Sequence, residues 1–163
     1  MTGTTHILFV CLGNIIRSPL AEHMFTHLAA QARVADNYRV ESAGTSAYHV
    51  GERPDSRMRR VAAKHGLDYT GRARQFRAED YDRFDLIIAM DEDNLRHLKW
   101  QANSPDDERK LYTMRTFDPQ GGAKDGVPDP YYGGADGFDV TFEIVRRSCQ
   151  GLLEALENGD LKR

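Results

Sequence analysis

The chain has 163 residues, of which 40% are hydrophobic and 29% are charged, and its formal net charge is −3. This length and composition predict one globular domain over residues 1–163, and they exclude a disordered or membrane-embedded chain. The cationic residues are scattered, so we expect no nucleic acid partner, because binding a phosphate backbone needs a concentrated cationic surface. No apolar run is long enough to span a bilayer or form a secretory signal. We therefore expect a soluble, cytoplasmic protein with no membrane partner, whose two cysteines are reduced.

Short apolar segments alternate along the chain with segments of helical periodicity. Strands are predicted at residues 6–10, 38–41, 85–90 and 110–113. Helices are predicted at residues 18–33, 54–66, from 91 onward, and 135–158. Ser18 is the predicted cap of the first helix, and residues 42–45 form a predicted loop. The alternation indicates an α/β domain in which helices cover both faces of a parallel sheet.

The carboxyl ends of the strands are the usual ligand-binding edge of such a sheet. We therefore expect the functional site just after Val10, Glu41 and Met90. A loop rich in Gly, Pro and Asp, between Phe117 and Gly134, is a further candidate, because long irregular loops in compact domains are often functional.

The segment that follows the first predicted strand reads CLGNIIRSP, from Cys11 to Pro19. A loop from strand to helix gathers backbone N–H groups into a concave nest at the positive end of the helix, which suits a tetrahedral oxyanion. Gly13 permits close approach of the backbone, and Asn14 tolerates a left-handed conformation. The segment lacks the lysine and second glycine of a nucleotide-binding loop. The predicted oxyanion-binding residues are Leu12, Gly13, Asn14, Ile15, Ile16, Arg17 and Ser18.

Cys11 opens this loop and is the candidate nucleophile. A thiol at a helix N-terminus with an arginine nearby loses its proton readily. Arg17 carries a planar fork that can bind two phosphate oxygens, and Ser18 can donate its hydroxyl to the sulfur. A thiolate beneath a bound phosphate predicts phosphoryl transfer through a phosphocysteine intermediate.

This reaction needs a proton donor for the leaving oxygen, and the segment VPDPYYGG at residues 127–134 supplies a candidate. Asp129 lies between two prolines that restrict its backbone. It can protonate the departing oxygen and then, as a carboxylate, activate the water that hydrolyses phosphocysteine. Tyr131 and Tyr132 are predicted to form an aromatic wall. The predicted catalytic residues are therefore Cys11, Arg17 and Asp129.

These motifs make the sequence similar to the low-molecular-weight protein tyrosine phosphatases over nearly its whole length. The family's signature, C-x5-R-S-P, lies at residues 11–19 and its acid motif at residues 129–130, with shorter matches at residues 42–45, 73–75 and 89–91. The resemblance implies a four-stranded, twisted parallel sheet with flanking helices. It implies hydrolysis of phosphotyrosine in proteins with no metal or organic cofactor, by a monomer or a weakly self-associating protein. The substrate rim is expected to contain Ile15, Tyr48, Tyr131 and Tyr132, with Tyr48 in place of the family's tryptophan.

Two other positions depart from the family's pattern. Ile16 stands where many members have a second cysteine, so oxidised Cys11 has no obvious resolving partner. Gly71 stands where the family often has a histidine that supports the loop asparagine. Asn14 must then be held by another group, for which Ser42 is the candidate.

Three other functions fit the sequence less well than phosphotyrosine hydrolysis does. Relatives that act on phosphoarginine tend to have threonine at the position of Ile15, so this isoleucine favours aryl phosphates. Arsenate reduction needs further cysteines to accept a disulfide, and only the distant Cys149 is available. A phosphopeptide-binding module without activity would be expected to lack Cys11, Arg17 or Asp129.

A few polar or reactive residues have simpler structural interpretations. Cys149 lies on the apolar stripe of the last predicted helix and is expected in the core. His23 and His27 share a helical face, but without a third ligand we expect solvated surface rather than a zinc pair. Asp91 is predicted to cap a helix, with a supporting role in the site as the alternative.

Overall fold

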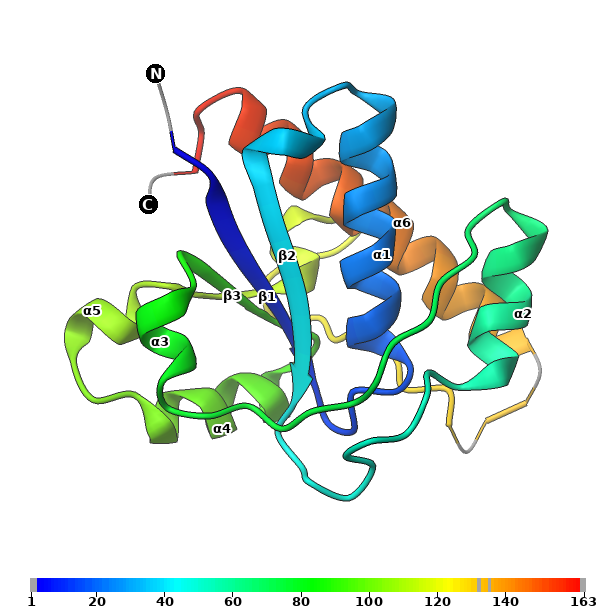
Figure 1. Cartoon of the computed structure of the whole chain (residues 1–163), viewed down its shortest axis with the longest axis horizontal. Helices are drawn as coiled ribbons and strands as arrows, with labels where there is room; N and C mark the ends of the chain where they lie inside the picture. The colour runs from blue at the N-terminus through cyan, green and yellow to red at the C-terminus, as the bar shows by residue number, and fades with distance from the viewer. Residues whose placement is uncertain (1–2, 132, 135, 162–163) are drawn as a thin grey trace.

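The computed structural model describes residues 3–131, 133–134 and 136–161. Within these residues, four parallel strands form one twisted sheet, which confirms the predicted fold class (Figure 1). The strands are β1 (Thr5–Cys11), β2 (Tyr38–Gly44), β3 (Leu86–Ala89) and β4 (Leu111–Thr113). Their order across the sheet is β2-β1-β3-β4, so the loop that follows β1 emerges between two neighbouring strands.

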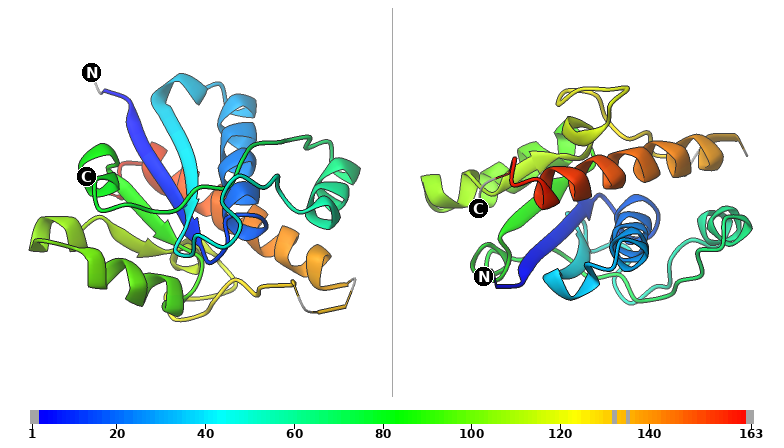
Figure 2. Two further views of the ribbon diagram at one scale, coloured as in Figure 1. Left: turned by 60° about the horizontal axis from the view of Figure 1, so that its bottom comes forward. Right: turned by 90° about the horizontal axis from the view of Figure 1, so that it is seen from above.

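Helices cover both faces of this sheet, as Figures 1 and 2 show. They are α1 (Arg17–Gln31), α2 (Ser56–Lys64), α3 (Asp80–Arg83), α4 (Glu92–Gln101), α5 (Pro105–Glu108) and α6 (Asp136–Glu157), with 3-10 turns η1 (Ala35–Asn37) and η2 (Met114–Phe117). α1 and α6 pack together on one face, and α2 packs against α6 on the same side. α3 and α4 cover the opposite face. None of the helices that the structure describes is both long and apolar enough to cross a membrane.

The core has two parts because successive side chains of β1 point to opposite faces of the pleated sheet. Ile7 and Phe9 pack in the cluster that contains α1 and α6, whereas Leu8 and Val10 pack in the cluster that contains α3 and α4. All four side chains are fully buried. Each contributes roughly 2 kcal/mol relative to an exposed position. The apolar run near the start of the chain is therefore a strand covered on both faces, as predicted.

The predicted start of the first helix is wrong by one residue, and the difference lies beside the site. α1 begins at Arg17, and Ile16 occupies its cap position without a side-chain hydrogen bond. Ser18 lies inside the first turn, where its hydroxyl contacts the sulfur of Cys11 rather than capping the helix. The same side chain cannot both cap the helix and face the sulfur of Cys11.

The predicted loop at residues 42–45 is also wrong, because β2 continues to Gly44. Gly44 pairs with Cys11 across the sheet, so the two strands run together up to the first residue of the signature. A Cβ atom at Gly44 would lie 2.8 Å from the carbonyl oxygen of Leu12. This close approach requires glycine, and it fixes β2 directly against the loop.

Asp91 begins a helix as predicted, and Asp55 has the same role at α2. Asp55 caps α2 by accepting a hydrogen bond from the backbone N–H of Arg57, and Asp91 caps α4 by accepting one from Asn94, both at 2.8 Å. Gly66, with φ of +81°, follows the end of α2 as predicted. The helices α3 and α5 were not predicted, because four residues are too few to show a helical period.

The long loop that follows η2 is fastened to α6 at its start. The carboxylate of the buried Asp118 accepts hydrogen bonds from Arg115 and Arg147, at N–O distances between 2.9 and 3.1 Å. Gly151 lets the carbonyl group of Phe117 rest on α6, since a Cβ there would lie 1.9 Å from this oxygen. These contacts fix the start of the loop, which then runs to the carboxyl edge of the sheet.

We predict that Asp118→Asn lowers the free energy of unfolding at neutral pH by roughly 2 kcal/mol. Burial disfavours the carboxylate, but hydrogen bonds from Arg147, the Gln120 backbone and Arg115 outweigh it and lower the pKa of Asp118 from 3.8 to about 2. This contribution is complete above pH 3.8 and is lost as the pH falls through about 2. Chemical denaturation at several pH values measures it, with the exposed Asp106→Asn as the control. Equal stability of wild type and Asp118→Asn at pH 7 would contradict the assignment.

Candidate active site

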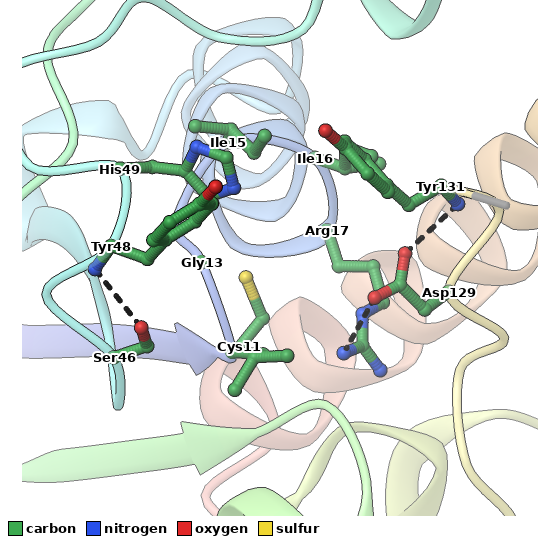
Figure 3. Close-up of a pocket in the computed structure, with 11 residues that line it drawn as sticks. Cys11, Gly13, Ile15, Ile16, Arg17, Ser46, Tyr48, His49, Asp129 and Tyr131 are labelled. Atoms are coloured by element: carbon green, nitrogen blue, oxygen red, sulfur yellow. Dashed lines mark hydrogen bonds and ion pairs between the residues drawn. The ribbon is translucent and has the colours of Figure 1, made fainter.

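A pocket of about 470 Å³ opens at the carboxyl edge of the sheet, where the sequence places the site (Figure 3). It is lined by Cys11, Leu12, Gly13, Ile15, Ile16, Arg17, Ser46, Tyr48, His49, Asp129 and Tyr131. Figure 3 shows Tyr48 and His49 on one side, Tyr131 and Asp129 on the other, and Cys11 between them. The structure thus brings the three predicted catalytic residues together, although 112 positions separate Arg17 from Asp129.

Asn14 sets the shape of the loop between β1 and α1. Its φ of 57° lies in the left-handed region, as predicted, and three hydrogen bonds hold its side chain there. The amide nitrogen donates to Ser18 Oγ at 2.9 Å and to Ser42 Oγ at 3.0 Å, and Oδ1 accepts from the backbone N–H of Arg74 at 2.9 Å. Ser42 supports Asn14 as the sequence suggested, and it does so with the help of two further partners.

The sulfur of Cys11 lies at the floor of the pocket, where only 3% of the residue is exposed. Three donors surround it: the backbone N–H groups of Asn14 and Ser18 at 3.3 and 3.4 Å, and Ser18 Oγ at 3.0 Å. Ser18 Oγ accepts a hydrogen bond from Asn14, and its own proton faces two acceptors, the sulfur of Cys11 at 3.0 Å and the carbonyl of Ala43 at 3.4 Å, of which the sulfur is the nearer. Donors of this kind stabilise a thiolate rather than a thiol.

Arg17 carries its guanidinium into the interior, with 3% of the residue exposed. Its Nη1 donates to Asp91 Oδ2 at 2.6 Å and to the carbonyl of Val127 at 2.9 Å, and Nη2 lies 3.6 Å from Asp129 Oδ2. Burial disfavours this charge, but the negative charges of Cys11, Asp91 and Asp129 outweigh it and raise the pKa of Arg17. Among the described residues Nε has no partner, so the edge formed by Nε and Nη2 can bind an oxyanion.

The loop offers backbone donors to the same space. Within the described part of the chain, no acceptor engages the N–H groups of Gly13, Ile15, Ile16 and Arg17. They stand at the positive end of α1, which has no acidic residue in its first turn. The arrangement suits a tetrahedral anion held above the Cys11 sulfur.

Contacts outside the pocket connect Asp129 to the loop between β1 and α1. The Asp129 side chain is 40% exposed, and its Oδ1 accepts from the backbone N–H of Tyr131 at 3.1 Å. Arg57 donates to the Tyr131 carbonyl at 3.4 Å and binds Asp55 through two nitrogens, at 3.2 and 2.8 Å. The backbone N–H of Asp55 in turn donates to the carbonyl of Ile15 at 2.8 Å. The carboxylate and the loop are therefore joined through α2.

The rim of the pocket is aromatic on two sides, and it includes one residue that the sequence did not indicate. Tyr48 is 83% exposed, Tyr131 lines the opposite wall, and Ile15 contributes an apolar wall. The predicted rim residue Tyr132 lies outside the described residues. His49 was missed; it lies against Gly13, at which a Cβ atom would come within 2.9 Å of the His49 ring. Proximity to Tyr48 was its single sequence signal.

Behind the loop, Asn14 is supported by two further residues, Glu22 and Arg74, which the sequence did not indicate. Glu22 accepts a hydrogen bond from Ser42 Oγ at 2.6 Å, and burial raises the pKa of its carboxyl group. Arg74 contributes its backbone N–H to Asn14, and its guanidinium binds Asp80. Position 74 lies in a segment that matched the family, but no chemical pattern marked Glu22.

The remaining reactive residues lie elsewhere. Cys149 is in the core, as predicted, and burial raises the pKa of its thiol. The side chain of His23 is 30% exposed and its ring stacks on Tyr69 with 5.0 Å between the ring centroids, so this predicted surface residue is only partly solvated. Among the described residues, no group of three or more His, Cys, Asp or Glu side chains is placed to hold a metal ion.

Known proteins resemble the chain in both sequence and fold. The family model for low molecular weight phosphotyrosine protein phosphatase matches residues 6–161. The low molecular weight phosphotyrosine protein phosphatase of Mus musculus is 42% identical over 153 residues, which cover 93% of this chain and 96% of that protein. The low molecular weight protein-tyrosine-phosphatase of Streptomyces coelicolor is 42% identical over 155 residues, or 94% of each chain. A crystal structure of a protein tyrosine phosphatase from Entamoeba histolytica, with Hepes in its active site, has a TM-score of 0.92 at 37% identity, covering 97% of this chain and 100% of that one.

We predict that Asn14→Ala weakens the binding of inorganic phosphate about tenfold, because it removes three hydrogen bonds that shape the loop. The left-handed backbone adds a further cost of about 1 kcal/mol for alanine. Asn14→Gly is the matched control, since glycine adopts the same φ without strain but also lacks the side chain. Isothermal titration calorimetry should show that both variants lose affinity. Wild-type affinity in Asn14→Gly would mean that the backbone conformation alone forms the site.

Proposed function

The chain belongs to the low molecular weight phosphotyrosine protein phosphatase family and is a phosphoric monoester hydrolase, and from this premise we propose that it hydrolyses phosphotyrosine in proteins through a phosphocysteine intermediate on Cys11. One observation carries the proposal. The sulfur of Cys11, the Nε–Nη2 edge of Arg17 and the carboxylate of Asp129 converge on a single pocket. A nucleophile, an oxyanion clamp and a proton donor are the three groups that this chemistry needs.

In the first step the Cys11 thiolate attacks phosphorus, so that a sulfur–phosphorus bond forms while the bond to the ester oxygen breaks. The unpaired N–H groups of the loop and the Nε–Nη2 edge of Arg17 bind the three non-bridging oxygens, which carry the charge in the transition state. The departing phenolic oxygen takes the proton of the Asp129 carboxyl group. The dephosphorylated tyrosine then leaves.

In the second step the Asp129 carboxylate takes a proton from water, and the resulting hydroxide attacks phosphorus. The sulfur–phosphorus bond breaks, and its electron pair returns to Cys11 as a thiolate. The three donors around the sulfur, two of them from Ser18, stabilise this leaving group. Inorganic phosphate is the second product.

The depth of the nucleophile favours aryl phosphates. Because Cys11 lies at the floor of the pocket, the phosphate must be carried there on an extended side chain, and the ring of phosphotyrosine is long enough to do this. Ile15, Tyr48 and Tyr131 supply walls for that ring. The apolar Ile15 offers no hydrogen bond to the guanidinium group of phosphoarginine, which makes that substrate the weaker candidate. The cytoplasmic location and the oligomeric state stay predictions from the sequence.

We predict that wild type hydrolyses a phosphotyrosine peptide faster than a phosphoarginine peptide of the same sequence, and that Cys11→Ser lowers this turnover at least about 10³-fold. Phosphate release from both peptides measures the preference. Cys149→Ala, which removes the other thiol, should retain the wild-type kcat. Preference for phosphoarginine would overturn the role assigned to Ile15, and no turnover of either peptide would favour a binding module.

We predict that Asp129→Asn lowers kcat for phenyl phosphate about 10²-fold or more, and lowers kcat for p-nitrophenyl phosphate much less. The nitrophenolate leaves without a proton, whereas the more basic phenolate needs one. Steady-state kinetics across leaving groups of increasing basicity measure the difference. The exposed Asp93→Asn controls for the change of charge. An equal loss for all leaving groups would show that Asp129 does not act as the acid.

A further inference from the structure

A second groove, of about 400 Å³, opens between α2 and the first turn of α6, beside the catalytic pocket. Val61 and Phe138 give it apolar walls. The other residues that line it are Arg57, Arg60, Lys64, Gly133, Gly134 and Asp139. No step of the proposed reaction uses this groove.

The groove is cationic because one face of α2 turns three positive side chains toward it. Arg57, Arg60 and Lys64 are three or four residues apart, which places them on the same side of the helix. The charge of Arg57 is matched by Asp55. Arg60 and Lys64 are exposed, and within the described part of the chain neither forms an ion pair, not even with Asp139 in the opposite wall. Two positive charges therefore face one negative charge.

The side chain of Arg57 lies between the groove and the catalytic pocket. The guanidinium carbon of Arg57 lies 5.4 Å from the ring centroid of Tyr131, which lines the pocket, and 4.7 Å from that of Phe138, which lines the groove. A peptide in extended conformation advances roughly 3.3 Å per residue, so three residues span about 10 Å. A side chain a few positions from a bound phosphotyrosine can therefore reach the groove.

We propose that this groove binds the carboxylate of an aspartate or glutamate that lies three or four residues from the phosphotyrosine of the substrate. The proposal rests on the phosphotyrosine phosphatase function argued above, and it names the class of substrate: tyrosine-phosphorylated segments with a nearby acidic residue. Two features favour an acidic side chain in the groove. The positive charges of Arg60 and Lys64 complement a carboxylate, and the groove is continuous with the catalytic pocket. The apolar walls accommodate the methylene groups of the acidic side chain.

The test measures kcat/KM for phosphotyrosine peptides in which one glutamate is moved from four residues before the phosphotyrosine to four residues after it. An otherwise identical neutral peptide is the reference. We expect an increase of about fivefold for glutamate at an offset of three or four on one side, and its loss at 0.5 M salt. Arg60→Gln/Lys64→Gln should abolish the increase and leave hydrolysis of p-nitrophenyl phosphate unchanged, because that substrate does not reach the groove.

The matched control is Arg39→Gln/Lys99→Gln, which removes the same charge from exposed positions outside both pockets and should keep the preference for acidic peptides. Charge reversal gives a second variant, whose expected gain of a new preference could not result from misfolding. Arg60→Glu/Lys64→Glu should prefer peptides in which lysine replaces the glutamate.

Two results would overturn the proposal. One is a wild-type enzyme that hydrolyses all peptides of the series equally well. The other is a preference for acidic peptides that persists in Arg60→Gln/Lys64→Gln. Failure of wild type to hydrolyse both p-nitrophenyl phosphate and the neutral peptide would instead refute the proposed function, so the two failures are distinguishable.

Discussion

A buried positive charge on the first turn of α1 organises the site. Leaving the Arg17 guanidinium unpaired at 3% exposure would cost several kcal/mol, so the fold has to bring acceptors to it. Asp91 comes from the end of β3, and the carbonyl of Val127 and the carboxylate of Asp129 come from the long loop before α6. Through its pairing with Arg17, the carboxylate of Asp129 is placed in the pocket that Cys11 also lines. Stability and the geometry of the pocket therefore depend on the same contacts.

A second network of hydrogen bonds runs behind the loop from Glu22 to the sulfur of Cys11. The carboxylate of Glu22 accepts the proton of Ser42, so the oxygen of Ser42 accepts from Asn14. Asn14 also donates to Ser18, whose hydroxyl lies 3.0 Å from the sulfur of Cys11 and 3.4 Å from the carbonyl of Ala43. A partly buried carboxylate on α1 thus orients hydrogen bonds that lead to the sulfur of Cys11. This network needs no side chain at residue 71, where the sequence has glycine instead of the family's histidine.

The sequence predicted the parts of the molecule in which a local pattern reflects a local physical requirement. The buried strand β1, the capping residue Asp91 and the left-handed Asn14 are of this kind. The error at Ser18 arose because a side chain that suits a helix cap also suits a hydrogen bond to a thiolate, and tertiary contacts decide between them. His49 and Arg57 were missed as parts of the site because their places depend on how residues 45–57 fold over the loop, which no periodicity records.

The two thiols of this chain, Cys11 and Cys149, lie in environments that prevent them from reacting with each other. Ile16, beside the nucleophile, cannot exchange disulfides, and Cys149 is enclosed in the core with its sulfur toward the carbonyl of Ala21. On the proposed mechanism, an oxidised Cys11 has no partner within its own chain and depends on thiols from solution for its recovery. Molecules oxidised beyond the sulfenic acid are lost permanently. The active fraction of a population of this protein would then record its accumulated exposure to peroxide, as a dosimeter does, rather than its momentary redox state.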